Sequence, residues 1–195
     1  MILSGLEIKA QIEAGNIHID DFSEKRLGPN SYNLRLHNEL LVYTDGVLDM
    51  KKPNEPRRII IPEEGLILVP GTLYLARTLE RTKTDHHIPI ITGRSSIGRL
   101  GISTHASAGF GDIGFDGTWT FQLAVTHPVR IYPFVEIAQI YFNTIQGEFI
   151  KYKSKKYQNQ TNIVPSLLYK DFEVSEGFPL VAETKVTQPS ILVEF

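Results

Sequence analysis

Residues 118–125 read Thr-Trp-Thr-Phe-Gln-Leu-Ala-Val, and this stretch decides the fold class. Its large apolar residues occupy every second position from Trp119 to Val125, so they would share one face of an extended strand. Gln122 falls on the opposite face. The pattern leaves two interpretations of that second face, because it could meet solvent or line a binding pocket.

Similar short segments precede and follow this strand, separated by Gly, Pro, Asn or Asp. Many short strands with regular turns predict an all-β barrel or sandwich rather than an alternating βαβ fold. One helix is predicted between Ser4, which has Glu7 at capping-box spacing, and Gly15. The predicted strands are 31–36, 39–43, 58–61, 66–69, 73–78, 88–91, 118–125, 129–132 and 137–142.

The bulk composition limits the possible functions. A chain of 195 residues, 42% hydrophobic and 22% charged, fits one folded domain or one domain with a tail. The net charge of −2 gives no basic excess for a nucleic-acid polymer. The absence of cysteine excludes disulfides, thiolate metal sites and the zinc-deaminase signature. No apolar run suits a membrane span and the N-terminus does not read as a signal peptide, so we expect a cytoplasmic protein without a membrane partner.

Residues 93–101 read Gly-Arg-Ser-Ser-Ile-Gly-Arg-Leu-Gly and suggest a site for a polyphosphate. Ser95 and Ser96 would open a short turn or helix, where hydroxyl and free backbone N–H groups donate to phosphate oxygens. Arg94 and Arg99 would add two-pronged, charge-assisted hydrogen bonds. On spacing alone, an N-cap followed by two solvent-facing arginines explains the run equally well.

Five blocks in order resemble the dCTP deaminase family, the deaminase branch of the trimeric dUTPase superfamily. The match runs from residue 1 to about residue 172, so a family domain would span 1–172 and residues 173–195 would form a C-terminal tail. The resemblance implies a distorted β-barrel that assembles as a homotrimer, with sites at subunit interfaces. It also implies a pyrimidine deoxynucleoside triphosphate as ligand, bound with Mg²⁺ mainly through its phosphates and without protein metal ligands. The blocks are 1–5, 29–36, 93–101, 107–115 with 117–123, and 156–160.

The resemblance also implies a role for each matching residue. Ser95 and Arg99 would contact the phosphates, and Arg99 would also reach the catalytic centre. Ala108 would line the base pocket through its backbone, and Phe115 would lie near the sugar. Asp112 would face the deoxyribose and orient the attacking water in members that also cut the triphosphate. Taken alone, an aspartate in a Gly-rich stretch is an ordinary turn residue.

The C-terminal matching block contributes two more candidates, Lys156 and Gln160, which would fold over the nucleotide. The remaining lysines of residues 151–156 are typical of a solvated loop. His105 precedes the pocket segment and is assigned a supporting hydrogen-bonding role, although a lone histidine is more often structural.

Gln122 occupies a position where the family normally carries a glutamate that moves protons. Such a carboxylate takes a proton from the water that attacks C4 of cytosine, and proton transfer of this kind is typically worth about 10²–10⁴-fold. A glutamine cannot exchange a proton near neutral pH, although its carbonyl oxygen can accept from the cytosine amino group. We therefore expect a pocket that binds dCTP and deaminates it poorly. The sequence leaves open whether Gln122 is natural or engineered.

The leading hypothesis is an enzyme that converts dCTP to dUTP and ammonia and continues to dUMP and diphosphate. Residues 108–112, Ala-Gly-Phe-Gly-Asp, resemble the version found in bifunctional members, and the aspartate for diphosphate release is present. One alternative is a dUTP or dCTP diphosphatase that never deaminates. Another is a non-catalytic, nucleotide-binding regulatory trimer, because a fold does not determine a function.

Overall fold

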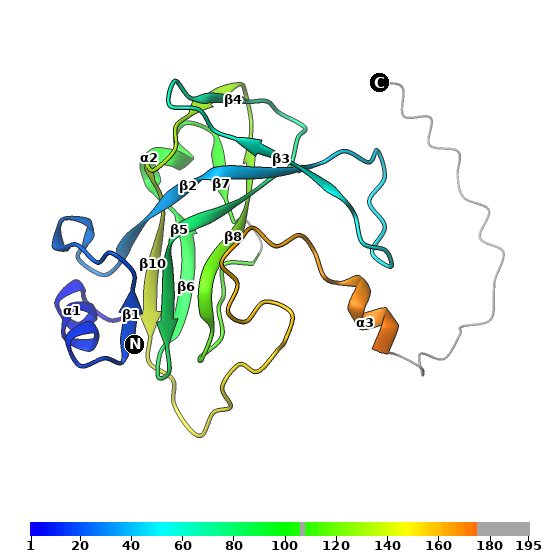
Figure 1. Cartoon of the computed structure of the whole chain (residues 1–195). Helices are drawn as coiled ribbons and strands as arrows, with labels where there is room; N and C mark the ends of the chain where they lie inside the picture. The colour runs from blue at the N-terminus through cyan, green and yellow to red at the C-terminus, as the bar shows by residue number, and fades with distance from the viewer. Residues whose placement is uncertain (106–107, 175–195) are drawn as a thin grey trace.

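A computed structural model of the chain describes residues 1–105 and 108–174, which form a distorted, near-closed barrel (Figure 1). Four short helical segments accompany the strands in these residues: α1 (Gly5–Glu13), η1 (Glu24–Arg26), α2 (Ser95–Gly98) and α3 (Tyr169–Val174). The strands are β1 (Ile17–Ile19), β2 (Tyr32–Tyr43), β3 (Pro56–Ile60), β4 (Leu66–Leu68), β5 (Tyr74–Thr84), β6 (Ile88–Gly93), β7 (Ile102–Thr104), β8 (Asp116–Val125), β9 (Val129–Ile131) and β10 (Glu136–Asn143).

The strands pair in the order β6-β10-β2-β5-β8-β7, with β1 added to β5 and β3 added to β2. All of these pairs are antiparallel, and β4 and β9 form a separate antiparallel pair. The prediction of an all-β barrel with a short N-terminal helix is therefore confirmed. None of the helices in the described ranges is long and apolar enough to cross a membrane.

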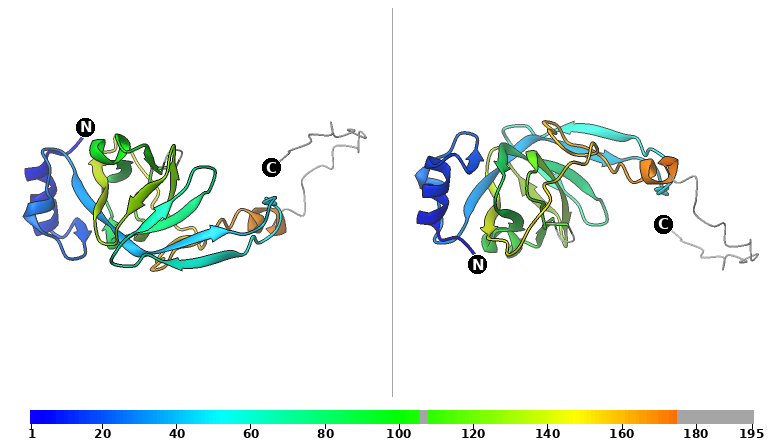
Figure 2. Two further views of the ribbon diagram at one scale, coloured as in Figure 1. Left: turned by 90° about the horizontal axis from the view of Figure 1, so that it is seen from above. Right: turned by 90° about the horizontal axis from the view of Figure 1, so that it is seen from below.

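The N-terminal helix begins where its capping signal predicts. The Ser4 hydroxyl oxygen accepts a 3.2 Å hydrogen bond from the backbone N–H of Glu7, which satisfies one of the free donors of the first turn. The helix ends just before Gly15, whose φ of +76° suits glycine. The helix α1 lies beside β1 at one edge of the barrel (Figures 1 and 2).

The apolar face of β8 forms part of the core, as its alternation predicts. Trp119 and Val125 are 7% exposed, while Phe121 and Leu123 are fully buried. The Trp119 indole also donates a 2.8 Å hydrogen bond to the Thr82 hydroxyl, so its polar atom is satisfied inside the barrel. Each such side chain contributes roughly 1.5–3 kcal/mol by burial, and together they fix which face of β8 points outward.

Several element boundaries differ from the prediction. The predicted strands 31–36 and 39–43 join in β2, because the interruption is a shift of register against β5 between Leu36 and Leu40 rather than a break in the chain. The predicted strand 73–78 extends to Thr84 as β5. The strands β1 and β7 were missed because three residues carry no clear alternation.

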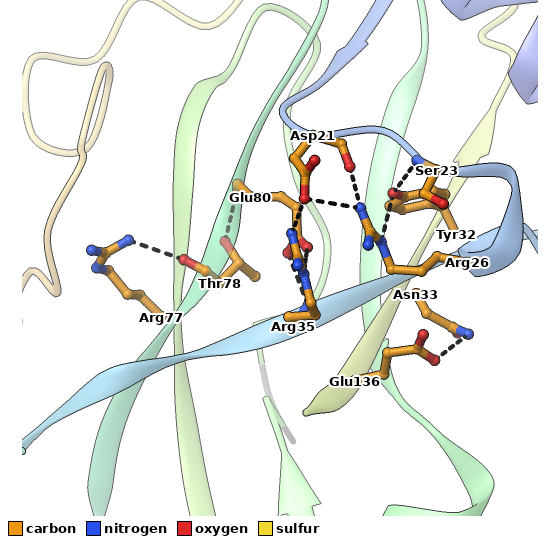
Figure 3. A network of polar contacts seen from close by, with 10 residues as sticks. All are labelled: Asp21, Ser23, Arg26, Tyr32, Asn33, Arg35, Arg77, Thr78, Glu80 and Glu136. Atoms are coloured by element: carbon orange, nitrogen blue, oxygen red, sulfur yellow. Dashed lines mark hydrogen bonds and ion pairs between the residues drawn. The ribbon is translucent and has the colours of Figure 1, made fainter. Parts of the chain in front are cut away.

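An ion-pair network explains how β5 can continue through a charged segment (Figure 3). The Glu80 side chain is fully buried, and its Oε1 lies 2.6 Å from Nε of Arg35 on β2. The backbone N–H of Arg35 donates to the other carboxylate oxygen at 2.8 Å, and Arg35 Nη2 lies 2.5 Å from Asp21 Oδ2. A buried carboxylate is tolerated when it is paired and hydrogen-bonded in this way, so the network fastens the turn at Asp21 to the barrel.

Two segments extend the barrel on one side, and we name them the arm (residues 39–60) and the strap (residues 151–168). The strap runs along β8, where its Asn159 N–H donates to the Asp116 carbonyl at 2.7 Å and its Gln160 carbonyl accepts from the Thr118 N–H at 2.9 Å. It then reaches the arm and continues into α3, shown in orange in Figure 1. The predicted boundary between residues 172 and 173 falls within α3, and residues 175–195 of the predicted tail lie outside the described residues.

Candidate active site

A cavity of about 540 Å³ lies between the outer face of β8, the arm and the strap. Five residues predicted from the sequence line it: Ala108, Asp112, Phe115, Gln122 and Gln160. The rest of its wall is largely apolar, with Tyr43, Leu48, Met50, Leu75, Trp119, Tyr157 and Val164 among the lining residues. A concave, mostly apolar site with a few polar groups is the usual form of a small-molecule site.

Gln122 lies half-buried on the cavity face of β8, opposite Leu75 of β5. Its Oε1 is 3.1 Å from Nδ1 of His105, and its backbone carbonyl accepts a 3.0 Å hydrogen bond from the His105 N–H. His105 is buried, adopts a left-handed backbone with φ +55°, and presents its ring edge-on to Phe121 at 6.5 Å between centroids. The side chain of Gln122 is thus held at the cavity wall by a residue that also lines the cavity.

The pKa of His105 is lowered from its ordinary value, chiefly because burial disfavours the charged imidazolium. The backbone of Ala108 and the side chain of Gln122 act in the opposite direction, because the charged imidazolium could donate hydrogen bonds to both of them at once. The balance keeps the imidazole neutral near neutral pH. A neutral ring carries one N–H donor and one acceptor nitrogen.

The segment that carries Ala108 and Asp112 is pinned against β6. The Ile91 N–H donates to the Gly109 carbonyl at 2.7 Å, and the Gly111 N–H donates to the Pro89 carbonyl at 2.9 Å. The contact is too close for a side chain at Gly111, because a Cβ there would lie 2.3 Å from the Trp119 ring. Glycine is therefore required for this segment to lie on the barrel wall.

Asp112 is exposed at the boundary between two hollows. It lines the main cavity and also a second one of about 340 Å³ formed with residues such as Phe149 and Tyr152. Its backbone carbonyl accepts a 3.2 Å hydrogen bond from the Phe115 N–H, so it also occupies a turn. The two interpretations from the sequence are thus compatible in one residue.

Phe115 is buried beside the same cavity. Its ring lies 4.6 Å from that of Trp119 and 6.1 Å from that of Tyr152 of the strap, measured between centroids. This aromatic cluster joins the barrel wall to the strap and gives one end of the cavity a flat apolar surface.

Gln160 and Lys156 lie on the strap, but only Gln160 lines the cavity. The Gln160 Nε2 donates a 2.6 Å hydrogen bond to the Thr118 carbonyl, while its Oε1 is buried without a partner among the described residues. Lys156 instead forms an ion pair with Asp171 of α3. In this arrangement the lysine ties the strap to the helix that follows it.

The predicted phosphate-binding run lies elsewhere on the same chain. Arg94, Ser95, Ser96 and Arg99 do not line either cavity described above, and α2 lies on the opposite side of the barrel from α3 in Figure 1. Arg94 is engaged with Glu136, donating 2.8 Å to its carbonyl oxygen and pairing with its carboxylate at 3.2 Å. The two serines and Arg99 are exposed. A single chain therefore does not bring this run to Gln122.

Sequence reasoning missed the arm as part of the site. Tyr43, Leu48, Met50 and Asn54 line the cavity from the arm, yet the stretch between the predicted strands 39–43 and 58–61 has no periodic pattern. The length of this stretch was the available signal, because long irregular loops often carry binding residues.

Within residues 1–105 and 108–174, no group of three or more His, Asp or Glu side chains could hold a metal ion.

Comparisons with known proteins identify the family of this chain. Residues 2–145 match a family model described as dCTP deaminase-like. The "dCTP deaminase, dUMP-forming" of Hathewaya histolytica is 60% identical over 173 residues, covering 89% of this chain and 100% of that protein. The protein of the same description from Cytophaga hutchinsonii is 58% identical over 173 residues, covering 89% of this chain and 99% of that protein.

A solved structure shares the fold. The 2'-deoxycytidine 5'-triphosphate deaminase from Agrobacterium tumefaciens superposes with a TM-score of 0.58 at 19% identity. The match covers 73% of this chain and 48% of that one, so this chain spans about half the length of that structure.

Proposed function

Because this chain belongs to the dCTP deaminase-like family, we propose that it is a hydrolase of pyrimidine deoxynucleoside triphosphates. The parent reaction is dCTP and water giving dUTP and ammonia, followed by cleavage of dUTP to dUMP and diphosphate. The observation that carries the proposal is the convergence of Gln122, Asp112, Phe115 and Ala108 on one cavity. The description of the similar proteins as dUMP-forming dCTP deaminases supports the same pair of reactions.

The pyrimidine base is placed against Gln122, where C4 undergoes substitution. Deamination requires a group that takes a proton from water and passes it to the departing amine. The Gln122 amide can position the base but cannot transfer that proton. The chain as written is therefore expected to bind dCTP and to deaminate it slowly.

Diphosphate release depends on Asp112. Its exposed carboxylate borders the cavity and can orient a water for attack on the α-phosphorus. Mg²⁺ would be held mainly by the nucleotide phosphates and waters, and a lone carboxylate near the ion is compatible with this arrangement. When bound, the ion neutralises charge that develops on the phosphates. This step does not use the proton transfer that Gln122 lacks.

The triphosphate is contacted by a second copy of the chain. Arg94, Ser95, Ser96 and Arg99 lie away from the cavity in one chain, and Ser95, Ser96 and Arg99 are exposed. A homotrimer with sites between neighbours would place this run opposite the cavity of the next subunit. The serine hydroxyls and Arg99 would then bind the phosphates through charge-assisted hydrogen bonds.

Residues 1–172 form the catalytic domain, and the strap closes the site. Gln160 lines the cavity and is fixed by its bond to Thr118. Lys156 is one short segment away and, on leaving Asp171, would reach the nucleotide from the same side. The strap would thus add both polar contacts after the ligand has entered.

Product analysis tests the proposal. The purified chain is incubated with dCTP and, separately, with dUTP in the presence of Mg²⁺, and ammonia, dUMP and diphosphate are quantified. We expect diphosphate and dUMP from dUTP, and little ammonia from dCTP. Diphosphate from both nucleotides with no ammonia would identify a diphosphatase without deaminase activity. This alternative is also consistent with Gln122, because the amide cannot transfer the proton that deamination requires. Nucleotide binding without any product would identify a regulatory trimer and would refute the enzymatic proposal.

A further inference from the structure

His105 and Gln122 form a pair that is fixed at the backbone and adaptable at the side chains. The backbone bond from the His105 N–H to the Gln122 carbonyl, 3.0 Å long, holds the two residues in register at the end of β7. Their side chains meet at 3.1 Å between Nδ1 and Oε1. Both residues line the cavity, so a ligand base meets a coupled pair rather than a single side chain.

The neutral imidazole ring of His105 has fewer N–H donors than the carbonyl oxygens that it can reach. Nδ1 of the ring faces the oxygen of the Gln122 side chain. The Ala108 backbone also influences the pKa of His105 as a hydrogen-bond partner, and we assign that contact to Nε2, the remaining ring nitrogen. The imidazole is buried and neutral, so it has one N–H to donate. It can therefore donate to one of these two oxygens at a time.

Two arrangements satisfy this count, and they present opposite groups to the cavity. With the proton on Nδ1, the ring donates to the Gln122 oxygen and the amide NH₂ faces the cavity. With the proton on Nε2, the ring donates to Ala108, Nδ1 becomes an acceptor, and the amide turns over so that its NH₂ donates to Nδ1 and its oxygen faces the cavity. The terminal torsion of glutamine is broad and roughly two-fold, and the two ends of the amide have nearly the same shape.

We propose that His105 and Gln122 recognise the substituent at position 4 of the pyrimidine, and that their two interchangeable arrangements let the pocket bind either an amino or an oxo group there. An amide NH₂ facing the cavity donates to the 4-oxo group of uracil, and an amide oxygen facing it accepts from the 4-amino group of cytosine. The inference rests on the proposed function, in which the base changes from cytosine to uracil between the two reactions. One pocket then serves both steps, since the hydrogen-bonding arrangement of His105 and Gln122 changes with the base.

The surroundings favour a sharp response of this pair. Leu75 lies opposite Gln122 across the strand pair, and the Phe121 ring contacts His105 edge-on. Once the base fills the cavity and excludes water, a mismatched donor or acceptor is costly in such apolar surroundings, because it loses its hydrogen bond without a replacement. The base therefore selects the arrangement that pairs with it.

The tautomer of His105 in each complex tests the proposal directly. The full chain is labelled with ¹⁵N-histidine and saturated with the α,β-imido analogue of dCTP or of dUTP in the presence of Mg²⁺. Long-range ¹H–¹⁵N spectra distinguish protonated from unprotonated ring nitrogens. The chain has six histidines, and the signals missing in a His105→Asn variant belong to His105. We expect the Nδ1–H form with the dUTP analogue and the Nε2–H form with the dCTP analogue. The same His105 tautomer in both complexes would overturn the proposal.

Affinities of the same analogues provide a second test. The unchanged chain should bind both within about tenfold. Gln122→Glu should shift the ratio at least tenfold toward the dCTP analogue, since a carboxylate offers only acceptors to the base. Because this variant should also deaminate the cytosine of the analogue, its affinity is taken from the initial binding phase, before ammonia appears. His105→Leu should weaken both analogues, and His105→Asn, which keeps one donor and one acceptor, should recover part of that loss. A ratio that Gln122→Glu leaves unchanged would contradict the proposal. Failure of both analogues to bind would instead refute the proposed function, and with it the proposed recognition by His105 and Gln122.

Discussion

Arg35 holds the carboxylate of Glu80 through two contacts, a 2.6 Å ion pair from Nε and a 2.8 Å hydrogen bond from its backbone N–H. Glu80 is fully buried, and Arg35 continues to Asp21 at the surface. This chain of contacts joins β2, β5 and the turn after β1 (Figure 3). It allows β5 to include a charged segment, and the same strand contributes Leu75 to the wall of the candidate site.

Glu80→Gln should destabilise the barrel by roughly 1–3 kcal/mol, because a neutral amide loses the charge-assisted bonds to Arg35 and buries an NH₂ group without a partner, although Asp21 still pairs with the arginine. The measurement is urea denaturation followed by circular dichroism. Glu24→Gln is the matched control, since the ion pair of Glu24 with Lys9 lies at the surface and should matter little. A double variant, Arg35→Met with Glu80→Leu, should recover much of the lost stability. A Glu80→Gln variant as stable as the Glu24→Gln control would show that the pair does not carry the fold.

Gln122→Glu should increase ammonia release from dCTP by about 10²–10⁴-fold, the usual contribution of a general acid–base group. The change is nearly isosteric, so binding should survive. Diphosphate release at saturating dUTP is the internal control, since that step does not use the proton carrier at position 122 and saturation compensates for weaker binding of uracil. Equal deaminase activity in both versions would refute the role assigned to Gln122.

Gly111→Ala should disturb the wall of the cavity. The new methyl group would lie 2.3 Å from the Trp119 ring and 2.8 Å from the Pro89 carbonyl oxygen. Relief of such overpacking typically costs about 1–3 kcal/mol and moves the backbone, so Asp112 would shift with it. We expect a lower melting temperature and weaker binding of the dUTP analogue. Gly46→Ala, which meets no atom within 4 Å, is the control and should leave both unchanged.

Acidification should destabilise the protein through two buried histidines and one partly buried histidine. Burial is the largest cause lowering the pKa of His37, His87 and His105. The unfolded chain, with ordinary values near about 6.5, therefore binds protons that the folded chain does not. Stability is then complete above that pH and falls as the pH drops below it toward the lowered folded values. Unfolding free energies between pH 7 and 5 should show a shallower decline for His105→Asn than for the unchanged chain. A decline of equal slope would show that His105 does not contribute.

Much of the lining of the candidate site could be predicted from the sequence, because those residues are local in sequence. The alternation around Gln122 determined the buried face of β8, and therefore which face could look into a cavity. The Gly-rich segment at Asp112 and the block at Gln160 were identified by resemblance, and both line the cavity found in the structure. Short-range patterns sufficed wherever one strand or one turn positions the side chain.

The remainder depends on contacts between distant segments. The extension of β5 through Glu80 required a partner on β2, which no local pattern reveals. The wall formed by Tyr43 and Leu48 exists because the arm and the strap meet, as the 3.1 Å bond from the Ser166 N–H to the Tyr43 hydroxyl shows. The hydrogen bond between His105 and Gln122 joins β7 to β8 in the same way. Ser95 was identified by resemblance, but the contact across chains proposed for it would not follow from any pattern within one chain.

Mixed oligomers should reveal whether Ser95 and Asp112 act from different subunits. Ser95→Ala with Arg99→Ala removes the proposed phosphate contacts, and Asp112→Asn removes the water-orienting carboxylate, so each variant alone should release little diphosphate from dUTP. Random mixing in equal amounts gives trimers in which about a quarter of all interfacial sites combine both intact halves. Coexpression of differently tagged variants should therefore restore roughly a quarter of the unmodified activity. As the control, a chain that carries all three substitutions, mixed with either variant, should restore none. If mixing the two variants also restored nothing while trimers formed, both groups would have to act within a single chain.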